Sequence, residues 1–227
     1  AEDLLLDFRE QQMLAAGTLH IGVGPSAFLT FIESTVTAFA RVYPAISVAV
    51  EDGSEDRMMQ SLRQGELDLA LGSARHLDAW QDVAVQRVAP LHLYFIARLD
   101  HPLGNAKVTA KALLSYPVVM PSAGLGVDQE LREAYIQAGL TPTPPRYRCN
   151  QFGLVQKLVE TTDAISPILS LAEPVDRFQQ RYLVFQDIIK LQRPELAIAT
   201  PKARDLSPAG VAFVNLFKGF LSDGSEG

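Results

Sequence analysis

The apolar residues of this chain follow two alternating spacings after Gly17. Between residues 18 and 24 every second residue is apolar, which is typical of a half-buried strand. The next stretch repeats its apolar residues at helical intervals until Pro44 ends it. Ser54 and Gly65 are suited to capping the two ends of a second helix. The expected elements are a strand at 18–24, a helix at 26–43, a strand at 46–51, a helix between 54 and 65 and a strand at 67–71.

The strand expected at Leu67–Leu71 is nearly all apolar. Strands of this kind are usually buried on both faces of a parallel sheet. The first seventy residues therefore predict a βαβαβ half with right-handed crossover connections. Ligands of such sheets bind outside the carboxyl ends of the strands.

The alternation starts again after a turn-rich break at residues 99–103. We expect the chain to leave a first lobe near residue 94 and to return near residue 194. The expected strands lie near 83–88, 91–97, 118–120, 164–168, 183–185 and 195–200, with a further strand ending near Cys149. The expected helices lie at 109–116, 127–138 (closed by Gly139), 150–160 (capped by Asn150) and 207–221.

These elements predict an α/β fold with two Rossmann-like lobes joined by two crossover strands. Lobe I is expected to hold residues 17–93 and 195–227, and lobe II residues 94–194. Residues 1–16 have the spacing of an amphipathic helix. They are interpreted either as the end of a longer helix or as a frayed terminal helix.

The last expected helix begins with Ser207 as its cap and Pro208 in its first turn. Apolar residues recur along it at helical spacing. The expected apolar face comprises Val211, Val214, Leu216, Phe217, Phe220 and Leu221.

Composition limits the classes of function. The chain has 227 residues, 48% of them hydrophobic, and a formal net charge of −6. The densest basic group, Arg146 and Arg148, is small, whereas nucleic-acid binders concentrate positive charge on one face. Any contact with DNA must therefore come from a segment or partner outside this chain.

Cys149 is the one cysteine, which excludes an intramolecular disulfide and fits a reducing cytoplasm. The sequence shows no secretory signal, although a processed export protein would look the same. No apolar stretch approaches the roughly 20 residues that span a bilayer. We expect a cytoplasmic protein with no membrane partner.

Four short segments occur in a characteristic order, and together they carry a resemblance. They are Gly17–Gly24 (GTLHIGVG), Arg41–Pro44 (RVYP), Leu62–Leu71 (LRQGELDLAL) and Arg98–Leu103 (RLDHPL). With these segments the chain resembles the effector-binding domain of LysR-type transcriptional regulators, from about Ala16 to Leu221. The segment Thr161–Pro167 (TTDAISP) departs from the family pattern, because it keeps the proline but lacks the usual Gly-x-Gly.

The resemblance implies a type 2 periplasmic-binding-protein-like fold with a small-molecule effector bound between the lobes. It also implies a DNA-binding helix-turn-helix that precedes this chain, a linker helix that ends in residues 1–16, and a homodimer or tetramer. Near the dimer contact we expect the helix that begins at Ser26 and the strand at 46–51.

In lobe I the candidate ligand-binding residues follow the expected strands. Ser26, between Pro25 and Ala27, could offer its hydroxyl to a carboxylate, and it is equally suited to capping the helix. For Ser54 the capping role is favoured. Arg75 follows the strand at 67–71 together with Ser73 and Ala74. Its guanidinium could bind an effector carboxylate through two hydrogen bonds, or it could be a solvated loop arginine.

In lobe II the segment Pro121–Val127 (PSAGLGV) links a strand to a helix. Its glycines and Ser122 would let a ligand approach the backbone closely. Gln151 opens the next helix, and a later strand is expected to end at Pro167 and Ile168. Core packing or capping explains these residues equally well. The lobe II candidates are Pro121, Ser122, Gly126, Val127, Gln151, Pro167 and Ile168.

The sequence offers no catalytic, cofactor or metal motif. The four histidines are far apart, and neither HExxH nor a cysteine–histidine zinc spacing occurs. Cys149 is expected to be a buried structural thiol. Trp80 and the phenylalanines at helical spacing are expected in the core. The prediction is a regulatory sensor rather than an enzyme, and the alternative is a periplasmic solute-binding protein of the same fold.

Overall fold

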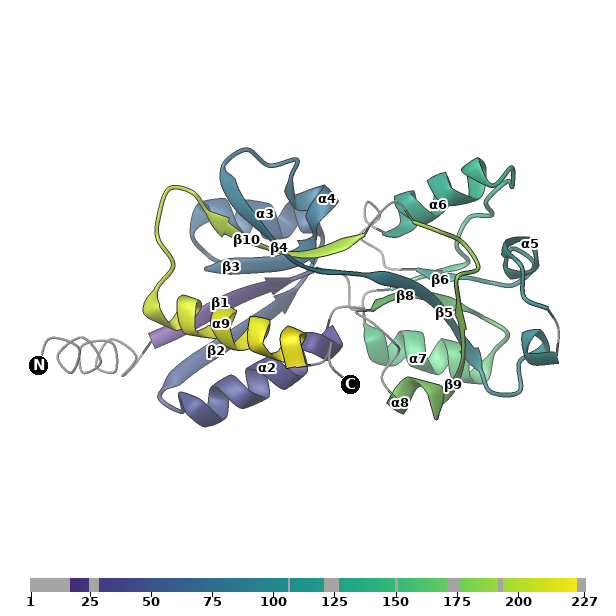
Figure 1. Ribbon diagram of the computed structural model, residues 1–227, viewed down its shortest axis with the longest axis horizontal. Helices are drawn as coiled ribbons and strands as arrows, with labels where there is room; N and C mark the ends of the chain where they lie inside the picture. The colour runs from purple at the N-terminus through teal and green to yellow at the C-terminus, as the bar shows by residue number, and fades with distance from the viewer. Residues whose placement is uncertain are drawn as a thin grey trace, which may run out of the picture. The chain divides into compact units, whose positions relative to one another are not determined.

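The computed structural model describes residues 17–24, 29–105, 107–120, 127–149, 151–170, 176–191 and 194–223. Within these residues the chain forms two compact units, whose elements Figure 1 labels. Unit 1 contains the described residues up to Val88 and from Leu196 onwards, and unit 2 those from Ala89 to Glu195. The chain therefore passes from unit 1 to unit 2 within a strand, after Val88, and not near residue 94.

A five-stranded sheet carries unit 1. Its first strand pairs in parallel with the second and third, which confirms the expected βαβαβ half. The returning strand near the C-terminus pairs with the third strand in the antiparallel direction. In order across the sheet the strands are β2 (Ile46–Asp52), β1 (Gly17–Val23), β3 (Leu69–Ser73), β10 (Glu195–Pro201) and β4 (Val83–Pro90).

Helices cover both faces of this sheet. In Figure 1, α2 (Leu29–Val42) and α9 (Pro208–Asp223) lie on one face, and α3 (Glu55–Gln64) and the short α4 (Ala74–Leu77) lie on the other. The apolar side of α3 packs on small strand residues, which allow the helix to approach the sheet closely. This core cluster comprises Met58, Met59, Leu62, Leu67, Ala70, Ala74, Leu77, Val83, Ala197 and Ala199, with Trp80 and Val85 packed against it.

Three of the expected helix caps of unit 1 are confirmed. The Ser54 hydroxyl accepts a hydrogen bond from the backbone N–H of Arg57 at 3.3 Å, and Gly65 ends α3 with a φ of 77°. At the start of α9 the Ser207 hydroxyl accepts from the N–H of Gly210 at 3.1 Å. Each cap satisfies a backbone group that the helix end would leave without a partner.

The expected apolar face of α9 was partly wrong. Val211 and Phe220 are 46% and 41% exposed, whereas Phe213, which the sequence reading left out, is 1% exposed. The buried positions are Gly210, Phe213, Val214 and Phe217, which recur every three or four residues. A helix this rich in apolar residues fits more than one helical phase, so periodicity alone misplaced its inner face.

Unit 2 is built on an antiparallel sheet of three strands. They are β8 (Ser166–Ser170), β5 (His92–Arg98) and β9 (Tyr182–Gln186), in that order. Two short strands, β6 (Val119–Met120) and β7 (Tyr147–Arg148), pair in parallel, and a parallel bridge joins Val118 to Ile165. The helices of unit 2 are α5 (Ala110–Leu113), α6 (Val127–Gln137), α7 (Phe152–Thr161) and α8 (Asp176–Gln179), and Pro102–Asn105 form a 3₁₀ turn.

Three details of unit 2 differ from expectation. Gln151 is the N-cap of α7 and makes no side-chain cap bond, while Asn150 lies outside the described residues. Pro167 and Ile168 stand inside β8 rather than at its end. A proline is tolerated there because β8 is an edge strand of its three-stranded sheet. On the outer side of an edge strand no backbone N–H has to pair with a neighbouring strand of the sheet. Cys149 is partly rather than fully buried.

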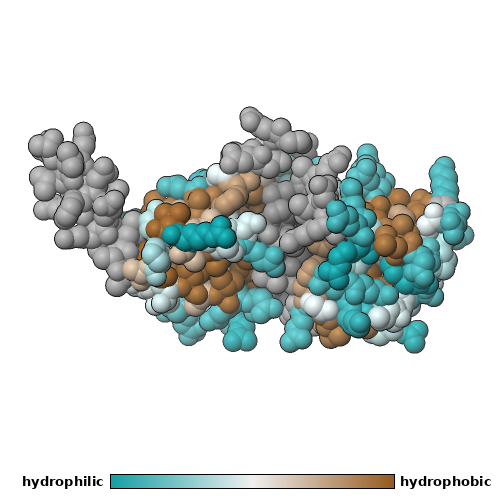
Figure 2. All heavy atoms as spheres, turned by 90° about the horizontal axis from the view of Figure 1, so that it is seen from below, coloured by the Kyte–Doolittle hydropathy of each residue, from teal (hydrophilic) through white to brown (hydrophobic). Residues whose placement is uncertain are grey.

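The surface of unit 1 is mixed in character. Figure 2 shows apolar patches on unit 1 set among polar side chains. The exposed apolar residues of this unit include Val42 on α2 and Val50 on β2, the two elements expected near a dimer contact. Single exposed apolar residues are normal, so the oligomeric state stays a prediction.

Candidate functional site

The carboxyl ends of the parallel strands of unit 1 form the first candidate site. In the strand register Val23 lies opposite Asp52 on one side and Leu71 on the other. Ser54 and Ser73 each follow the aligned residue of their strand by two positions. Parallel strands in register end at the same edge of a sheet, so both serines lie at the edge where ligands of this architecture bind.

Gly24 brings the chain after β1 close to β3 at this edge. Its N–H donates to the carbonyl oxygen of Leu71 at 2.8 Å. A Cβ atom at this position would lie 3.3 Å from that oxygen and 3.5 Å from the Cα of Gly72. A side chain would therefore crowd the backbone of β3, which explains why glycine stands here.

Ser73 is the most unusual polar residue of this edge. It is 4% exposed, and its hydroxyl has no hydrogen-bond partner among the described residues. It occupies the N-cap position of α4 but makes no side-chain cap bond. Most buried hydroxyl groups in proteins are hydrogen bonded, because burial without a partner costs about 1–3 kcal/mol. The Ser73 hydroxyl is therefore a candidate for a hydrogen bond to a bound ligand.

The neighbouring candidates are used differently. The Ser54 hydroxyl already caps α3, so the capping role favoured from the sequence is confirmed. Ala74 belongs to the core cluster under α3. Arg75 is exposed on α4, a short helix that the sequence did not predict. Of these residues only Ser73 combines burial with a hydroxyl that lacks a partner.

The expected residues of unit 2 separate into two environments. Pro167 and Ile168 are buried in β8, and Ile168 belongs to the core cluster of this unit, so packing accounts for its burial. Gln151 is exposed at the start of α7. Val127 begins α6. Pro25, Ser26, Ala27, Pro121, Ser122 and Gly126 lie outside the described residues.

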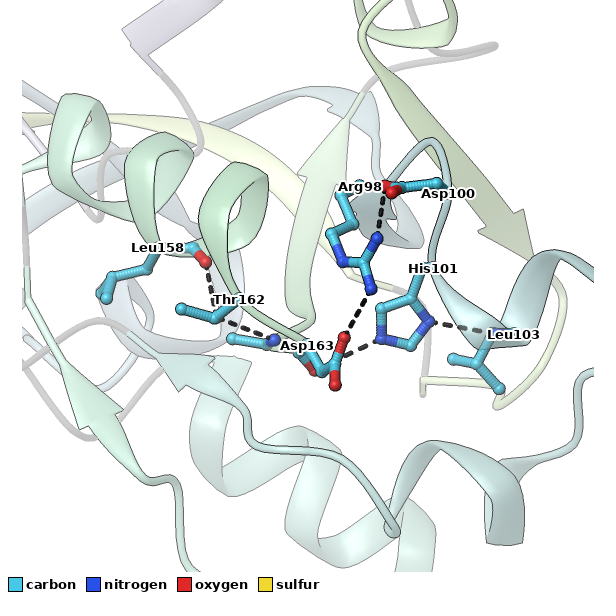
Figure 3. A network of polar contacts seen from close by, with 8 residues as sticks. Arg98, Asp100, His101, Leu103, Leu158, Thr162 and Asp163 are labelled. Atoms are coloured by element: carbon cyan, nitrogen blue, oxygen red, sulfur yellow. Dashed lines mark hydrogen bonds and ion pairs between the residues drawn. The ribbon is translucent and has the colours of Figure 1, made fainter.

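A polar network fixes the turn before β8, where the sequence lacks the expected glycines (Figure 3). Arg98, at the end of β5, pairs with Asp100 and donates to Asp163 Oδ1 at 2.8 Å. The hydrogen bond to Asp163, and then that to Asp100, raises the pKa of Arg98, and the hydrogen bond from Arg98 lowers the pKa of Asp100. The turn also has an internal support, because Thr162 Oγ1 accepts from the N–H of Ala164 at 3.0 Å.

His101 joins this network from a buried position. Its Nδ1 accepts a hydrogen bond from the N–H of Leu103 at 3.1 Å, so the ring proton belongs on Nε2. Nε2 lies 3.3 Å from the carbonyl oxygen of Asp163, to which it can donate. The ring also packs on Tyr116, with centroids 4.5 Å apart. The segment RLDHPL and the turn TTDAISP therefore hold one another in place.

We expect His101→Phe to lower the free energy of unfolding of unit 2 by about 1–3 kcal/mol. The variant keeps an aromatic ring beside Tyr116 but leaves the N–H of Leu103 without its acceptor. Urea denaturation and the hydrogen exchange rate of the Leu103 amide measure the effect. His92→Phe is the matched control, since His92 is exposed on the same chain segment. Equal stability of the two variants would contradict the role of His101.

Among the described residues no group of three or more histidine, cysteine, aspartate or glutamate side chains could hold a metal ion. In the part of the chain that the structure describes, no helix is both long enough and apolar enough to cross a membrane.

The architecture has many relatives of known structure. The effector-binding domain of QuiR, solved in complex with shikimate, superimposes with a TM-score of 0.72 at 16% identity, covering 92% of this chain and 98% of that domain. The chain therefore has the fold of that domain, the type 2 periplasmic-binding-protein-like fold, as expected. The chain belongs to the family described as the LysR substrate binding domain, which it matches over residues 13–222.

Characterised relatives agree with this assignment. The chain is 26% identical over 211 residues to the SDS degradation transcriptional activation protein of a Pseudomonas species, covering 89% of this chain and 67% of that protein. It is 24% identical over 162 residues to the HTH-type transcriptional regulator GalR of Pseudomonas putida, covering 71% of this chain and 41% of that protein. The chain thus spans only part of these relatives, which are named as regulators rather than enzymes.

Proposed function

We propose that this chain senses a small anionic metabolite and that the bound metabolite controls DNA binding by a helix-turn-helix segment elsewhere in the same protein. The family match and the regulator relatives support the sensing role. The net charge of −6 supports the assignment of DNA contact to another segment. A ligand can control such a segment only if it binds two states of the protein with different affinities. The protein would act in the cytoplasm.

The buried hydroxyl of Ser73, which has no hydrogen-bond partner among the described residues, is the observation that carries this proposal. It is buried at the carboxyl edge of the parallel strands, where an effector of this fold class is expected. A carboxylate or hydroxyl of the effector would supply the missing hydrogen bond. The complex of QuiR with shikimate, a hydroxylated carboxylate, supports this class of ligand. Arg75 stays a candidate for the carboxylate, and Gln151, Pro167 and Ile168 stay candidates in unit 2.

We expect Ser73→Ala to weaken effector binding about fivefold to tenfold, the usual effect of losing one buried hydrogen bond. Isothermal titration with a panel of small carboxylates that includes shikimate would first identify a binder and then compare the variant with the unchanged chain. The free energy of unfolding without ligand should rise by about 1–3 kcal/mol, because the variant removes a buried hydroxyl that has no partner among the described residues.

Ser115→Ala is the matched control, since Ser115 is exposed in unit 2. It should bind the same ligand as tightly as the unchanged chain. If the whole panel fails to bind, the sensing role is contradicted. If a ligand binds and Ser73→Ala binds it equally well, the role of Ser73 is contradicted while the sensing role stands.

A further inference from the structure

Unit 2 contains a pocket that includes none of the residues predicted from the sequence to bind a ligand. Its volume is about 290 Å³, at the lower end of the range for small-molecule sites. It lies among α6, the β6–β7 pair and the proline-rich segment between α6 and β7. Its charged lining residues are Asp128, Arg132 and Arg148.

The walls of this pocket are apolar and stiff. Leu131 and Tyr135 come from one face of α6, and Met120 comes from β6. Pro142, Pro144 and Pro145 also line the pocket. Proline fixes φ and has no N–H, so this part of the lining offers rigid rings and very few backbone donors. A pocket with such walls suits a flat apolar group and is largely formed before a ligand arrives.

The charges around the pocket favour an anion. Arg148 donates to Asp128 at 2.6 Å, so those two charges compensate one another. Arg132, one helical turn after Asp128, makes no hydrogen bond or ion pair with any described residue. Among the lining residues this leaves one positive charge in excess. A guanidinium presents several donors in one plane and matches a carboxylate well.

Tyr135 adds a hydroxyl that also lacks a partner. The residue is 4% exposed, and no described residue forms a hydrogen bond with its hydroxyl. Burial raises the pKa of Tyr135 to about 12, so the phenol stays neutral at physiological pH. A neutral hydroxyl can donate to an anion without repelling it. Because Arg132 and Tyr135 are three residues apart on α6, they lie on the same face of the helix.

We propose that this pocket binds a small aromatic carboxylate, whose ring contacts Tyr135 and the prolines and whose carboxylate meets Arg132. The apolar walls account for the ring, and the uncompensated guanidinium accounts for the carboxylate. The site is separate from Ser73, since every lining residue belongs to unit 2. A ligand here would contact α6, which begins at Val127, directly after the Pro121–Gly126 segment that the sequence predicts to meet the effector.

Benzoate is the probe for this proposal, and chemical shifts of backbone amides locate its binding. We expect saturable shifts in α6 between Asp128 and Tyr135 and in β7. Arg132→Gln should weaken benzoate binding about tenfold, the loss of a charged hydrogen bond, and Tyr135→Phe about threefold to fivefold. Benzamide, which has the same ring without the charge, should bind at least about tenfold more weakly than benzoate.

Two controls separate this site from its surroundings and from the effector site. Arg146 is an exposed arginine directly before β7, and it does not line the pocket. Arg146→Gln should therefore leave benzoate binding unchanged. Ser73→Ala should also leave it unchanged. The proposal is overturned if benzoate causes no saturable shifts in unit 2, or if Arg132→Gln and Arg146→Gln weaken binding equally. Loss of benzoate shifts in Ser73→Ala would place the ligand at the effector site instead.

Discussion

Phe213→Ala is expected to lower the free energy of unfolding of unit 1 by about 3–5 kcal/mol, the usual cost of truncating a buried phenylalanine. Phe213 is 1% exposed on α9, and its ring meets that of Phe39 on α2 in an edge-to-face contact with centroids 5.5 Å apart. Phe39 also packs on Tyr43 at 4.8 Å. These rings join α2 to α9, so the truncation leaves a cavity between the two helices.

Urea denaturation measures this loss, and hydrogen exchange of the β1 and β3 amides assigns it to unit 1. Phe220→Ala is the matched control, because Phe220 stands on the same helix but is 41% exposed. The control should lose less than about 1 kcal/mol. The double variant with Phe39→Ala should fall short of additivity by about 0.5–1.5 kcal/mol, the contribution of an aromatic pair. A Phe213→Ala protein as stable as the control would contradict the packing of α9.

The architecture of unit 1 could be predicted from the sequence because several local signals agreed. The alternation around Ile21, the run at Leu67–Leu71 and the caps at Ser54 and Gly65 each indicated one element and its limits. Their order left few topologies open, and the parallel pairing of β1 with β2 and β3 is the expected one. The phase of α9 failed because an almost wholly apolar helix has no polar face to fix its rotation.

The second half was predictable in outline, including its short strands: β6 and β7 stand where strands were expected, at 118–120 and near Cys149. The helix α8 was not expected, because its four residues are too few for a periodic pattern. The hydrogen bonds that hold the turn before β8 could not be predicted from the sequence either. Asp163 lies more than sixty residues after Arg98 and His101 in the sequence, and only the fold brings it to them.

The candidate site shows the same limit. The sequence predicted that Ser54 and Ser73 follow the carboxyl ends of two strands, and in the structure they lie at the same edge of the sheet. This was predictable because the register of the strands follows from their apolar pattern. Which of the two hydroxyls is left without a partner depends on three-dimensional contacts. The same is true of Arg132 and Tyr135, whose only sequence signal is their spacing on a helix beside a proline-rich segment. Helical spacing is too common to single them out.

Alkaline pH is expected to destabilise unit 2 through Tyr135. Its pKa rises from 10.0 to about 12 because burial disfavours the phenolate. An unfolded chain therefore releases this proton at lower pH than the folded one. The resulting stabilisation is complete below about pH 10 and is lost as the pH rises towards about 12, a change of about 3 kcal/mol. Tyr182 adds to the trend in the same direction, since burial and then its hydrogen bond to Glu160 raise its pKa.

Urea denaturation at a series of pH values between about 9 and 12 tests this expectation, with phenolate absorbance as a direct measure of ionisation. Tyr135→Phe should remove most of the fall in stability, because phenylalanine has no proton to release. Tyr182→Phe is the comparison variant, and it should remove a smaller part. The variant Tyr135→Phe also links this prediction to the proposed pocket, since the phenol that resists ionisation is the one that would meet a bound carboxylate. A pH profile of Tyr135→Phe that follows the unchanged chain would contradict the burial of this hydroxyl.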